Sequence, residues 1–487
     1  MKYDFTTLRE KLIQYLDSEY VCMYSEYPDT LDLTSEKELY ELSKIILHEL
    51  KCNGNFLRSS FDQFESNYNT QTKMTGNWWE WRIGIPYNYI YICLLADVDK
   101  KSCDKTLNKF VRRFAKYGDL TYANQASICK NLFMLGILME NETYIDESLR
   151  LAVKAFKPTN LFKANIANKL QKFCIRHPKF PHPTWLFKWK EGLYPDGTFI
   201  QHTSIPYIGT YGKEMLQFAA MVLSCGVQLP DKIMSYLLQW IKAFELNIYK
   251  CQIMLMNCGR SADKVDAFNE ASEMIKYLRQ INIHPENSEF TLLFQEYGDR
   301  VIYQTPKFRF CIAGSSDRIA SYEGFDGNNL FGRNQGLGAT YLYLPEDKNY
   351  KYGYFSRVGY ESIPGTLIES PSCVESKQPL FDYDPKYLKD LKFSCSGSLV
   401  TMQYHSNLFG SVSKYWGLLG DSIVCYGESD YPAQCVVDNR YNAELEVTEF
   451  GVFDKANRIE YYGVFEINDT QIVTKSGTRY QYKIHVL

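Results

Sequence analysis

One segment of the sequence combines side chains that can transfer protons. Residues 194–215, YPDGTFIQHTSIPYIGTYGKEM, contain His202 and Tyr211 without a helical or strand period. A neutral His accepts a proton near pH 7, and a Tyr can act as acid or base when a cation lowers its pKa below about 10. Arg260, in MLMNCGRSADK, is a suitable cation. A turn at 208–210 would bring His202 and Tyr211 to one wall of a cleft; alternatively, backbone groups satisfy both in a packed loop.

A second segment, TGNWWEWRIGIPYNYIYICLL over 75–95, concentrates aromatic side chains. Successive helical residues point about 100° apart, so Trp78, Trp79 and Trp81 cannot share one core face. At least one of them therefore borders solvent or a cleft, where an indole can stack on the apolar face of a sugar ring. The alternative is a helix start that is anchored by bulky side chains.

Asn124 lies in a third segment, LTYANQASICKNLFMLGIL over 120–138, directly before an amphipathic run. As a structural residue, it would cap the N-terminus of that helix, which is a common role of Asn. As a functional residue, its amide would donate a hydrogen bond to an anionic group of a substrate. The spacing does not decide between these two roles.

The elements that must position these residues are of two kinds. Up to about residue 285, apolar residues recur at helical spacing, as in EKELYELSKIILHEL (36–50). After His284-Pro285, short runs rich in β-branched and aromatic residues alternate with turn sequences such as DGNN and KSGT. The pattern predicts an α+β protein with a helical toroid or bundle over 1–285 and β-sandwich sheets over 286–487.

The composition excludes several classes of protein. The 487 residues suffice for two to four domains, and 45% hydrophobic with 23% charged residues exclude a mostly disordered chain. The 54 Lys and Arg against 57 Asp and Glu give a net charge of −3, without the basic surplus of a dedicated nucleic-acid binder. The 14 Cys form no C-x-x-C pair, which argues against structural zinc. We expect no transmembrane segment, and the N-terminus lacks the apolar region of a signal peptide.

Taken together, the segments resemble polysaccharide lyase family 8, which contains hyaluronate, chondroitin AC and xanthan lyases. The likeness spans roughly residues 75–445, and its most specific part is the QHT…Y-x-G-x-Y-G stretch. It is carried, in order, by NWWEWRIGIP (77–86), TYANQASICKNLFMLGIL (121–138), DGTFIQHTSIPYIGTYG (196–212), NCGRSADK (257–264), SSDRIASYEGFDGNNLFG (315–332), KYWGLLGDSIVCYG (414–427) and VVDNRYNAE (436–444). The resemblance implies an incomplete α/α toroid followed by antiparallel β-sheets.

The resemblance also implies a role for each candidate site residue. His202 and Tyr211 would transfer protons, and Asn124 would hydrogen-bond the uronate carboxylate. Arg260 would support Tyr211 and the substrate charge, and Glu323 matches a supporting glutamate. For substrate binding, Trp78 and Trp79 would form an aromatic platform, and Lys264 stands where the family often has a second arginine. Lysine keeps the charge but loses the bidentate geometry.

The implied reaction is β-elimination on a uronate-containing glycosaminoglycan. The enzyme removes the C5 proton next to the carboxylate and expels the C4 oxygen, so hydrogen-bond donors must stabilise the charge that develops. This scheme requires no metal and no cofactor. The expected partner is an acidic polysaccharide (hyaluronan, chondroitin or chondroitin sulfate), with no nucleic acid, and the protein is expected to be a monomer. The expected location is extracellular or virion-associated, although no signal peptide is visible.

Some features depart from the family pattern and keep alternatives open. The Lys-rich segment 157–192 is longer than usual, so it adds either a wall to a groove for an acidic polymer or a surface insertion. The β domain is expected to be abridged. A distant likeness to baculovirus envelope proteins leaves a viral or invertebrate-associated origin open.

Two other functions compete with the lyase. The first is a catalytically inactive glycosaminoglycan-binding or viral envelope protein on the same fold. The second is a glycoside hydrolase on a helical toroid. It is disfavoured because that chemistry needs two carboxylates flanking the scissile bond, whereas the matched motifs supply Asn, His, Tyr and Arg.

Overall fold

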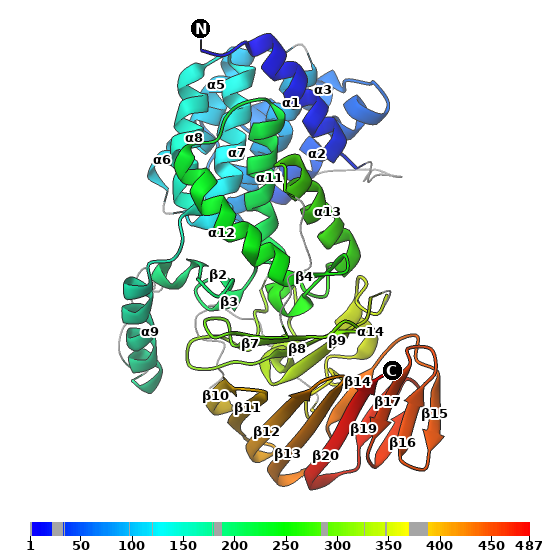
Figure 1. Ribbon diagram of the computed structural model, residues 1–487. Helices are drawn as coiled ribbons and strands as arrows, with labels where there is room; N and C mark the ends of the chain where they lie inside the picture. The colour runs from blue at the N-terminus through cyan, green and yellow to red at the C-terminus, as the bar shows by residue number, and fades with distance from the viewer. Residues whose placement is uncertain are drawn as a thin grey trace. The chain divides into compact units, whose positions relative to one another are not determined.

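The protein divides into two compact units, and each is described by itself. The helical unit comprises Met1–Lys157, Glu214–Leu237 and Tyr277–Ile283, and the sheet unit comprises Pro158–Lys213, Leu238–Lys276 and His284–Leu487. The computed structural model (Figure 1) describes residues 2–21, 33, 35–96, 98–118, 120–177, 179, 188–283, 291–325, 327–345, 348–369 and 388–487. The predicted border at 285/286 lies outside the described residues, so the division into 1–285 and 286–487 stays a prediction.

The helical unit consists of a series of helices. They are α1 (Phe5–Glu19), α2 (Glu36–Cys52), α3 (Arg58–Asn67), α4 (Ile85–Leu95), α5 (Lys100–Leu107), α6 (Arg113–Tyr117), α7 (Tyr122–Leu138) and α8 (Glu142–Phe156), with the π-helical turns η1 (Glu80–Gly84) and η2 (Asn108–Arg112). Three further helices, α11 (Tyr211–Ser224), α12 (Asp231–Asn247) and α13 (Ala267–Gln280), each contribute residues to both units.

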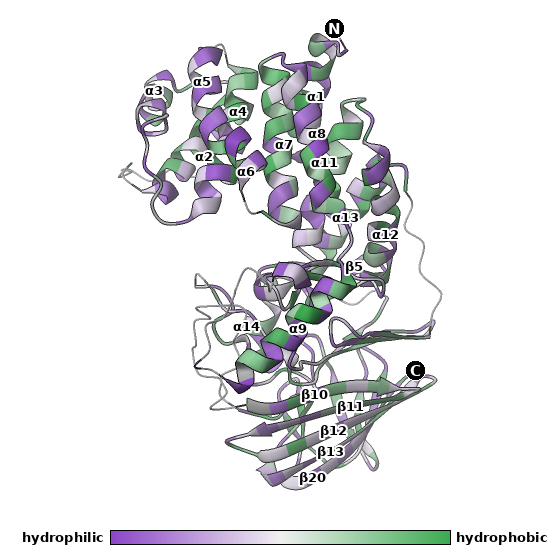
Figure 2. Cartoon of the chain, turned by 90° about the vertical axis from the view of Figure 1, so that its left-hand side faces the viewer, coloured by the Kyte–Doolittle hydropathy of each residue, from purple (hydrophilic) through white to green (hydrophobic). Residues whose placement is uncertain are grey.

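The apolar pattern of each helix matches its burial. The 36–50 segment forms α2 as predicted, and its buried residues include Leu39, Leu42 and Ile46 on one face. Ser35 caps this helix by accepting a hydrogen bond from the backbone N–H of Glu38. Helix α7 is apolar around most of its circumference and is buried along nearly its whole length, which is typical of a central helix. Figure 2 shows this contrast between a largely hydrophobic α7 and the more polar α2.

The sheet unit is built from antiparallel ladders throughout its described residues. Its largest sheet has the order β10-β11-β12-β13-β20-β17-β16-β15, and a four-stranded sheet has the order β6-β7-β8-β9. The large sheet comprises β10 (Leu388–Ser396), β11 (Leu399–Ser406), β12 (Gly410–Leu419), β13 (Ser422–Ala433), β15 (Leu445–Thr448), β16 (Gly451–Asp454), β17 (Ile459–Tyr462) and β20 (Gly477–Val486); the four-stranded sheet comprises β6 (Leu292–Gln295), β7 (Arg300–Gln304), β8 (Arg309–Ala313) and β9 (Ala339–Tyr343).

Smaller elements complete this unit. They are the sheet β1 (Gly192–Leu193), β2 (Phe199–Gln201) and β3 (Ile205–Pro206), the pair β4 (Ile248–Tyr249) and β5 (Gln252–Ile253), the sheet β14 (Val436–Asn439), β19 (Gln471–Thr474) and β18 (Phe465–Asn468), the helices α9 (Leu161–Arg176) and α14 (Tyr354–Val358), and the short 3-10 turns η3 (Lys188–Lys190), η4 (Leu255–Asn257), η5 (Gly259–Ser261) and η6 (Gly332–Gly336).

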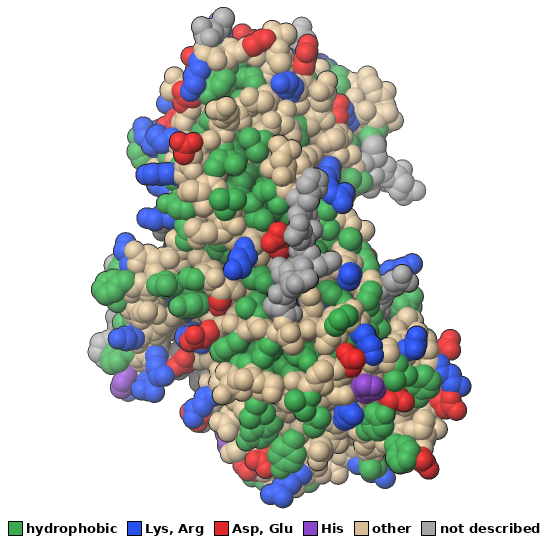
Figure 3. Space-filling model, in the orientation of Figure 1, with side chains coloured by type: hydrophobic (Ala, Val, Ile, Leu, Met, Phe, Trp, Pro, Cys, Tyr) green, Lys and Arg blue, Asp and Glu red, His purple; other side chains and the backbone are tan. Residues whose placement is uncertain are grey.

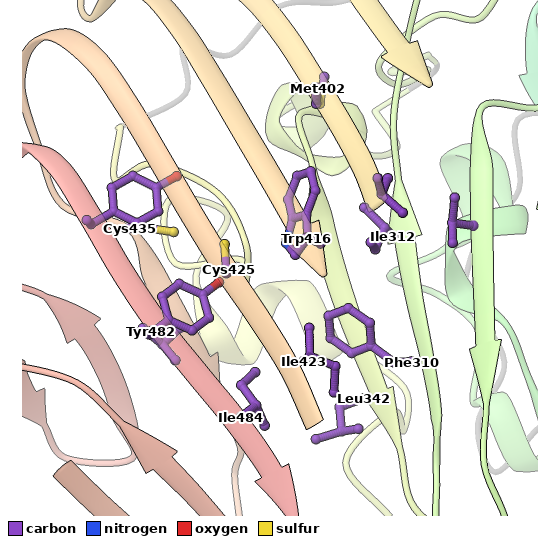
Figure 4. Close-up of a cluster of buried hydrophobic side chains, with 14 of the residues drawn as sticks. Phe310, Ile312, Leu342, Met402, Trp416, Ile423, Cys425, Cys435, Tyr482 and Ile484 are labelled. Carbon is purple, nitrogen blue, oxygen red and sulfur yellow. The ribbon is translucent and has the colours of Figure 1, made fainter. Parts of the chain in front are cut away.

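The core of the sheet unit lies between the four-stranded and the eight-stranded sheet. Figure 4 shows Phe310, Ile312 and Leu342 from the smaller sheet facing Trp416 and Ile423 from the larger one. Strand β12 alternates buried and more exposed residues along its length, which places Trp416 on the core face. The predicted fold class, helices followed by antiparallel sandwich sheets, is therefore confirmed. None of the described helices is both long and apolar enough to cross a membrane.

Candidate active site

Five side chains of the sheet unit form one connected cluster. Glu323 is fully buried, and its Oε1 lies 2.8 Å from Nδ1 of His202 and 3.0 Å from Nη1 of Arg260. The Tyr207 hydroxyl donates to the other carboxylate oxygen, Oε2. Nη2 of Arg260 donates to the hydroxyl oxygen of Tyr211 at 3.3 Å. The structure thus brings together four of the predicted residues, His202, Tyr211, Arg260 and Glu323, and adds Tyr207.

His202 is presented by a strained turn. It follows strand β2, and both His202 and Thr203 have left-handed backbone conformations, with φ of 50° and 69°. Such conformations cost about 1–3 kcal/mol each for residues other than glycine and persist only where the surroundings enforce them. Here the buried carboxylate of Glu191 accepts a hydrogen bond from the Thr203 N–H at 3.1 Å, and the Ser204 carbonyl accepts one from Ala320. Glu191 is therefore a positioning residue for His202.

Tyr211 is placed by the close approach of two turns. The N–H of Gly209 donates to the Asn257 carbonyl at 2.9 Å, and a Cβ on Gly209 would lie 2.4 Å from the sulfur of Cys258. Gly259 has φ of +53°, and a Cβ there would lie 2.0 Å from the Tyr207 ring. Only glycine fits such contacts without displacing the neighbouring chain. The predicted turn at 208–210 is confirmed, and Tyr211 becomes the first residue of α11.

The charges of the cluster are mutually stabilising. Burial alone would raise the pKa of Glu323, but the charge and hydrogen bond of His202, the charge of Arg260 and the Tyr207 hydroxyl lower it to about 2. Burial opposes the charge of Arg260, yet Tyr207, Tyr211 and Glu323 together raise its pKa above the ordinary value. Burial, reinforced by the charge of Glu323, raises the pKa of Tyr207 well above 10, so Tyr207 remains a neutral hydroxyl. The site therefore holds an ionised Glu323 and a cationic Arg260 at neutral pH.

This arrangement fixes what each group can do chemically. Because the Glu323 carboxylate only accepts hydrogen bonds, Nδ1 of His202 carries the proton of this bond, and Nε2 is the ring nitrogen left to exchange a proton with a ligand. A guanidinium that donates to a phenol oxygen favours the phenolate form. Tyr211 and His202 are both partly exposed, and their rings lie 5.2 Å apart between centroids. Two proton acceptors thus lie side by side, beside a fixed cation.

Lys264 belongs to the same unit but not to the cluster. It is exposed and follows Arg260 within the turn, where its N–H donates to the Ser261 carbonyl. Its side chain has no ion pair among the described residues, so its predicted substrate contact stays a prediction. Phe325 is 44% exposed and lies beside Arg260, with 5.5 Å between the guanidinium carbon and the ring centroid. It offers an apolar surface next to the cation.

The remaining predicted residues lie in the helical unit. Asn124 is the third residue of α7, whose N-cap is Thr121, so the interpretation of Asn124 as an N-cap was wrong. Helix α7 begins two residues before Asn124, at Tyr122, whose φ of 40° is left-handed. The Asn124 side chain is partly exposed and makes no hydrogen bond within the described part of the chain. Its amide is available to a ligand.

The three tryptophans are separated as the helical spacing requires. Trp81 is buried and donates its indole N–H to the Thr75 carbonyl, whereas Trp78 is 38% exposed. Trp79 is partly buried, with its ring edge-on to Tyr40. The prediction that at least one indole borders solvent or a cleft is confirmed for Trp78. The joint action of Trp78, Trp79 and Asn124 with the cluster of the sheet unit stays a prediction.

Sequence reasoning missed Tyr207, Glu191 and Phe325. Tyr207 stands in the Y-x-G-x-Y-G stretch, whose first Tyr was a detectable signal. Glu191 and Phe325 carry no spacing signal, since their roles depend on a turn 12 residues from Glu191 and on the position of Arg260.

Comparison with known proteins assigns the family. Residues 57–160 and 179–293 match the N-terminal alpha-helical domain of polysaccharide lyase family 8, and residues 294–448 match its super-sandwich domain. The chain belongs to polysaccharide lyase family 8. Among curated family relatives, a xanthan lyase of Bacillus sp. (strain GL1) is 26% identical over 441 residues, which cover 77% of this chain and 44% of that protein. Hyaluronate lyase HylB of Enterococcus faecalis is 23% identical over 382 residues, which cover 62% of this chain and 35% of that protein.

Solved structures share the family 8 fold. The chondroitin AC lyase of Streptomyces coelicolor A3, in complex with chondroitin sulphate, has a TM-score of 0.68 at 17% identity, over 99% of this chain and 80% of that one. The xanthan lyase of Paenibacillus has a TM-score of 0.69 at 17% identity, over 99% and 56%. The chain spans less than half the length of the two curated relatives.

Proposed function

We propose that this protein is a lyase that cleaves an acidic, uronate-containing polysaccharide by β-elimination. The observation that carries the proposal is the cluster in which Arg260 and Glu323 hold Tyr211 and His202 side by side. Membership of polysaccharide lyase family 8 supports it. Hyaluronan, chondroitin and chondroitin sulfate are the proposed substrates, as expected from the sequence.

The proposed reaction moves the C5 proton and breaks the C4–oxygen bond. Tyr211, as phenolate, removes the C5 proton of the uronate, and the electron pair forms the C4–C5 double bond as the C4–oxygen bond breaks. The leaving oxygen takes the proton back from Tyr211. Arg260 stabilises the phenolate, and Asn124 donates to the uronate carboxylate as negative charge develops on it. His202, fixed by Glu323, shares the base or charge-stabilising role at its Nε2 atom.

The experiment that tests the proposal follows the ultraviolet absorbance of the 4,5-unsaturated uronate product. Hyaluronan, chondroitin, chondroitin sulfates and xanthan are incubated separately with the folded chain in the presence of EDTA. We expect absorbance to rise with at least one uronate polymer. A flat trace with every polymer, from protein that gives a cooperative thermal transition, would contradict the proposal and favour an inactive binding protein.

The proposed substrate also bears on where the protein acts. A polymer too large to enter a cell must be met outside it, so we propose an extracellular or virion-associated location. That the protein is a monomer and binds no nucleic acid stays a prediction.

Asn124→Ala is expected to lower kcat/KM about 10²-fold, the usual cost of losing one donor to developing negative charge. Stability should stay within about 0.5 kcal/mol, because the amide makes no hydrogen bond among the described residues and Ala favours a helix. A matched control is Asn141→Ala, since Asn141 caps α8 by accepting from Thr143 and Tyr144. The control should lose about 1 kcal/mol of stability and keep its activity. Full activity in Asn124→Ala would remove Asn124 from the mechanism.

Tyr207→Phe tests a positioning role. The substitution leaves Oε2 of Glu323 and the backbone N–H of Arg260 without the hydroxyl that joins them, which should cost about 1–3 kcal/mol. Because Tyr207 acts through its neighbours, we expect kcat to fall about tenfold while KM changes less than about twofold. Steady-state kinetics and thermal melting separate the two effects. An unchanged kcat in the destabilised variant would show that Tyr207 is only structural.

A further inference from the structure

Helix α9 of the sheet unit buries small or polar side chains and exposes large apolar ones. Its buried residues, Ala164, Ala167, Gln171 and Cys174, are small or polar and follow each other at spacings of three and four. Three large apolar side chains are exposed instead: Phe162 is 75% exposed, Ile166 41% and Phe173 42%. Figure 2 shows the alternating hydrophobic and hydrophilic colours along this helix. Exposed apolar side chains that gather on one face mark a binding surface.

The same exposed face is basic. All ionisable side chains of α9 that carry a full charge are cations, namely Lys163, Lys169, Lys172 and Arg176. Lys172 pairs with Asp317 at 2.6 Å, and Lys163 lies 5.2 Å from the ring centroid of Trp189. Lys169 and Arg176 have no ion pair among the residues that the structure describes. Figure 3 shows blue basic and green apolar side chains together over the projecting α9.

The apolar and basic side chains share one stripe. At 3.6 residues per turn, Phe162, Ile166, Lys169, Phe173 and Arg176 fall within about a quarter of the helix circumference. At a rise of about 1.5 Å per residue, the stripe from Phe162 to Arg176 is about 21 Å long. A cation therefore stands between two apolar groups in the middle of the stripe.

Helix α9 is firmly attached to the segment that presents His202. The Gln171 side chain donates to the Asp317 carbonyl at 3.2 Å, and the buried Lys190 donates both to Gln171 and to the Arg318 carbonyl. Ala164 packs in one apolar cluster with Ile200 of β2, two residues before His202. The stripe is thus held in place relative to the catalytic cluster.

This helix also lies outside the residues that match the N-terminal domain of the family. The match to the N-terminal domain of family 8 stops at residue 160 and resumes at 179, and α9 (Leu161–Arg176) fills the interval. The stripe therefore lies outside the residues that match the family.

We propose that the α9 stripe is an accessory binding surface for an acidic polysaccharide. The apolar side chains would contact the apolar faces of sugar rings, and Lys169 and Arg176 would pair with carboxylates or sulfates along the polymer. A lipid surface fits less well, because Lys169 interrupts the apolar stripe that would enter the acyl region. The choice of polymer class rests on the proposed function, whereas the surface itself does not.

The test compares two charge-reversed variants by affinity electrophoresis in gels that contain hyaluronan or chondroitin sulfate. Both carry Tyr211→Phe so that the polymer is not consumed. The first variant adds Lys169→Glu and Arg176→Glu. The matched control adds Lys101→Glu and Lys105→Glu on α5, where both lysines are exposed and have no ion pair among the described residues. The control changes net charge equally on another surface.

We expect the α9 variant to bind the polymer about five- to tenfold more weakly than the control, with a smaller loss at high salt. A uronate tetrasaccharide, too short to occupy the stripe and the cluster together, should bind both variants equally at the cluster. Equal polymer retardation of both variants would overturn the proposal. So would unchanged polymer binding together with loss of cosedimentation with phosphatidylglycerol vesicles, which would assign the stripe to a lipid surface.

The binding experiment on α9 and the test of the lyase proposal can fail independently of each other. If the wild-type protein forms no unsaturated product, the lyase proposal fails while the gel still measures polymer binding by α9. If product forms and the two variants bind polymer equally, only the α9 proposal fails.

Discussion

Tyr211→Phe is expected to lower kcat about 10³-fold while the protein stays folded. The substitution removes only the oxygen that accepts from Arg260, and in our mechanism that oxygen carries the C5 proton to the leaving group. One positioned acid–base group contributes about 10²–10⁴-fold, and Tyr211 would act in both steps. The phenylalanine ring keeps the contacts with Tyr207 and His202, at 4.6 and 5.2 Å between centroids.

The measurement is the initial rate of unsaturated product formation, together with a thermal melt. A matched control is Tyr297→Phe, because Tyr297 stacks on Tyr194 at 4.6 Å in the same unit but outside the cluster. The control should keep the wild-type rate. A Tyr211→Phe protein with near-wild-type turnover would require a different base, and His202 would be the next candidate.

Glu323→Gln is expected to lower both activity and stability. The carboxylate holds the proton of His202 on Nδ1, whereas an amide can present its NH₂ group to that atom and favour the other tautomer. In hydrolytic triads a carboxylate likewise holds the histidine in the correct tautomer. We therefore expect kcat to fall about 10²–10³-fold. Removing one partner of a buried ion pair also leaves Arg260 uncompensated, which should cost about 3 kcal/mol.

The stability loss should depend on pH in a defined direction. The pKa of Glu323 is lowered from 4.5 to about 2, so its ionised form stabilises the folded protein fully above about pH 4.5. That contribution is lost as pH falls toward 2. The difference in unfolding free energy between the wild type and Glu323→Gln should therefore be constant from pH 6 to 8 and shrink below about pH 4.5.

Urea unfolding at several pH values measures this difference. The control is Glu296→Gln, whose carboxylate is exposed and lies 4.0 Å from Arg318, and it should change stability by less than about 0.5 kcal/mol. A difference that stayed constant down to pH 3 would mean that the Glu323 carboxyl is not held ionised by His202 and Arg260.

Much of the fold could be predicted from periodicity. Helix α2 follows from the 3.6-residue spacing of Leu39, Leu42 and Ile46, and strand β12 shows the two-residue alternation that places Trp416 in the core. Both are local patterns in which the buried face repeats along one element. The division into two units could not be predicted from periodicity. It depends on how the helices pack, and α11, α12 and α13 each contribute residues to both units.

Most residues of the site that lie in recognisable sequence motifs were predicted. Tyr211 and Arg260 lie beside turns whose glycines leave a sequence signal, His202 was found from its residue type, and Glu323 was found through the family resemblance. Tyr207 was not found, although it stands in the Y-x-G-x-Y-G stretch, because the stretch does not show its partner. Glu191 was not found because a buried Glu looks like any surface Glu until its partner is known. The partner of Tyr207 is 116 positions away along the chain. The N-cap interpretation of Asn124 was wrong because α7 begins at Tyr122, and an apolar pattern fixes the start of a helix only to within a few residues.

The most direct test of the central claim is cleavage of hyaluronan or chondroitin in water enriched in heavy oxygen, followed by mass spectrometry of the products. Elimination breaks the C4–oxygen bond without adding water. We therefore predict unsaturated products that contain no heavy oxygen and weigh one water less than the corresponding saturated fragments. Saturated products with one heavy oxygen per cleavage would show hydrolysis and contradict the mechanism that we assign to Tyr211, His202, Arg260 and Glu323.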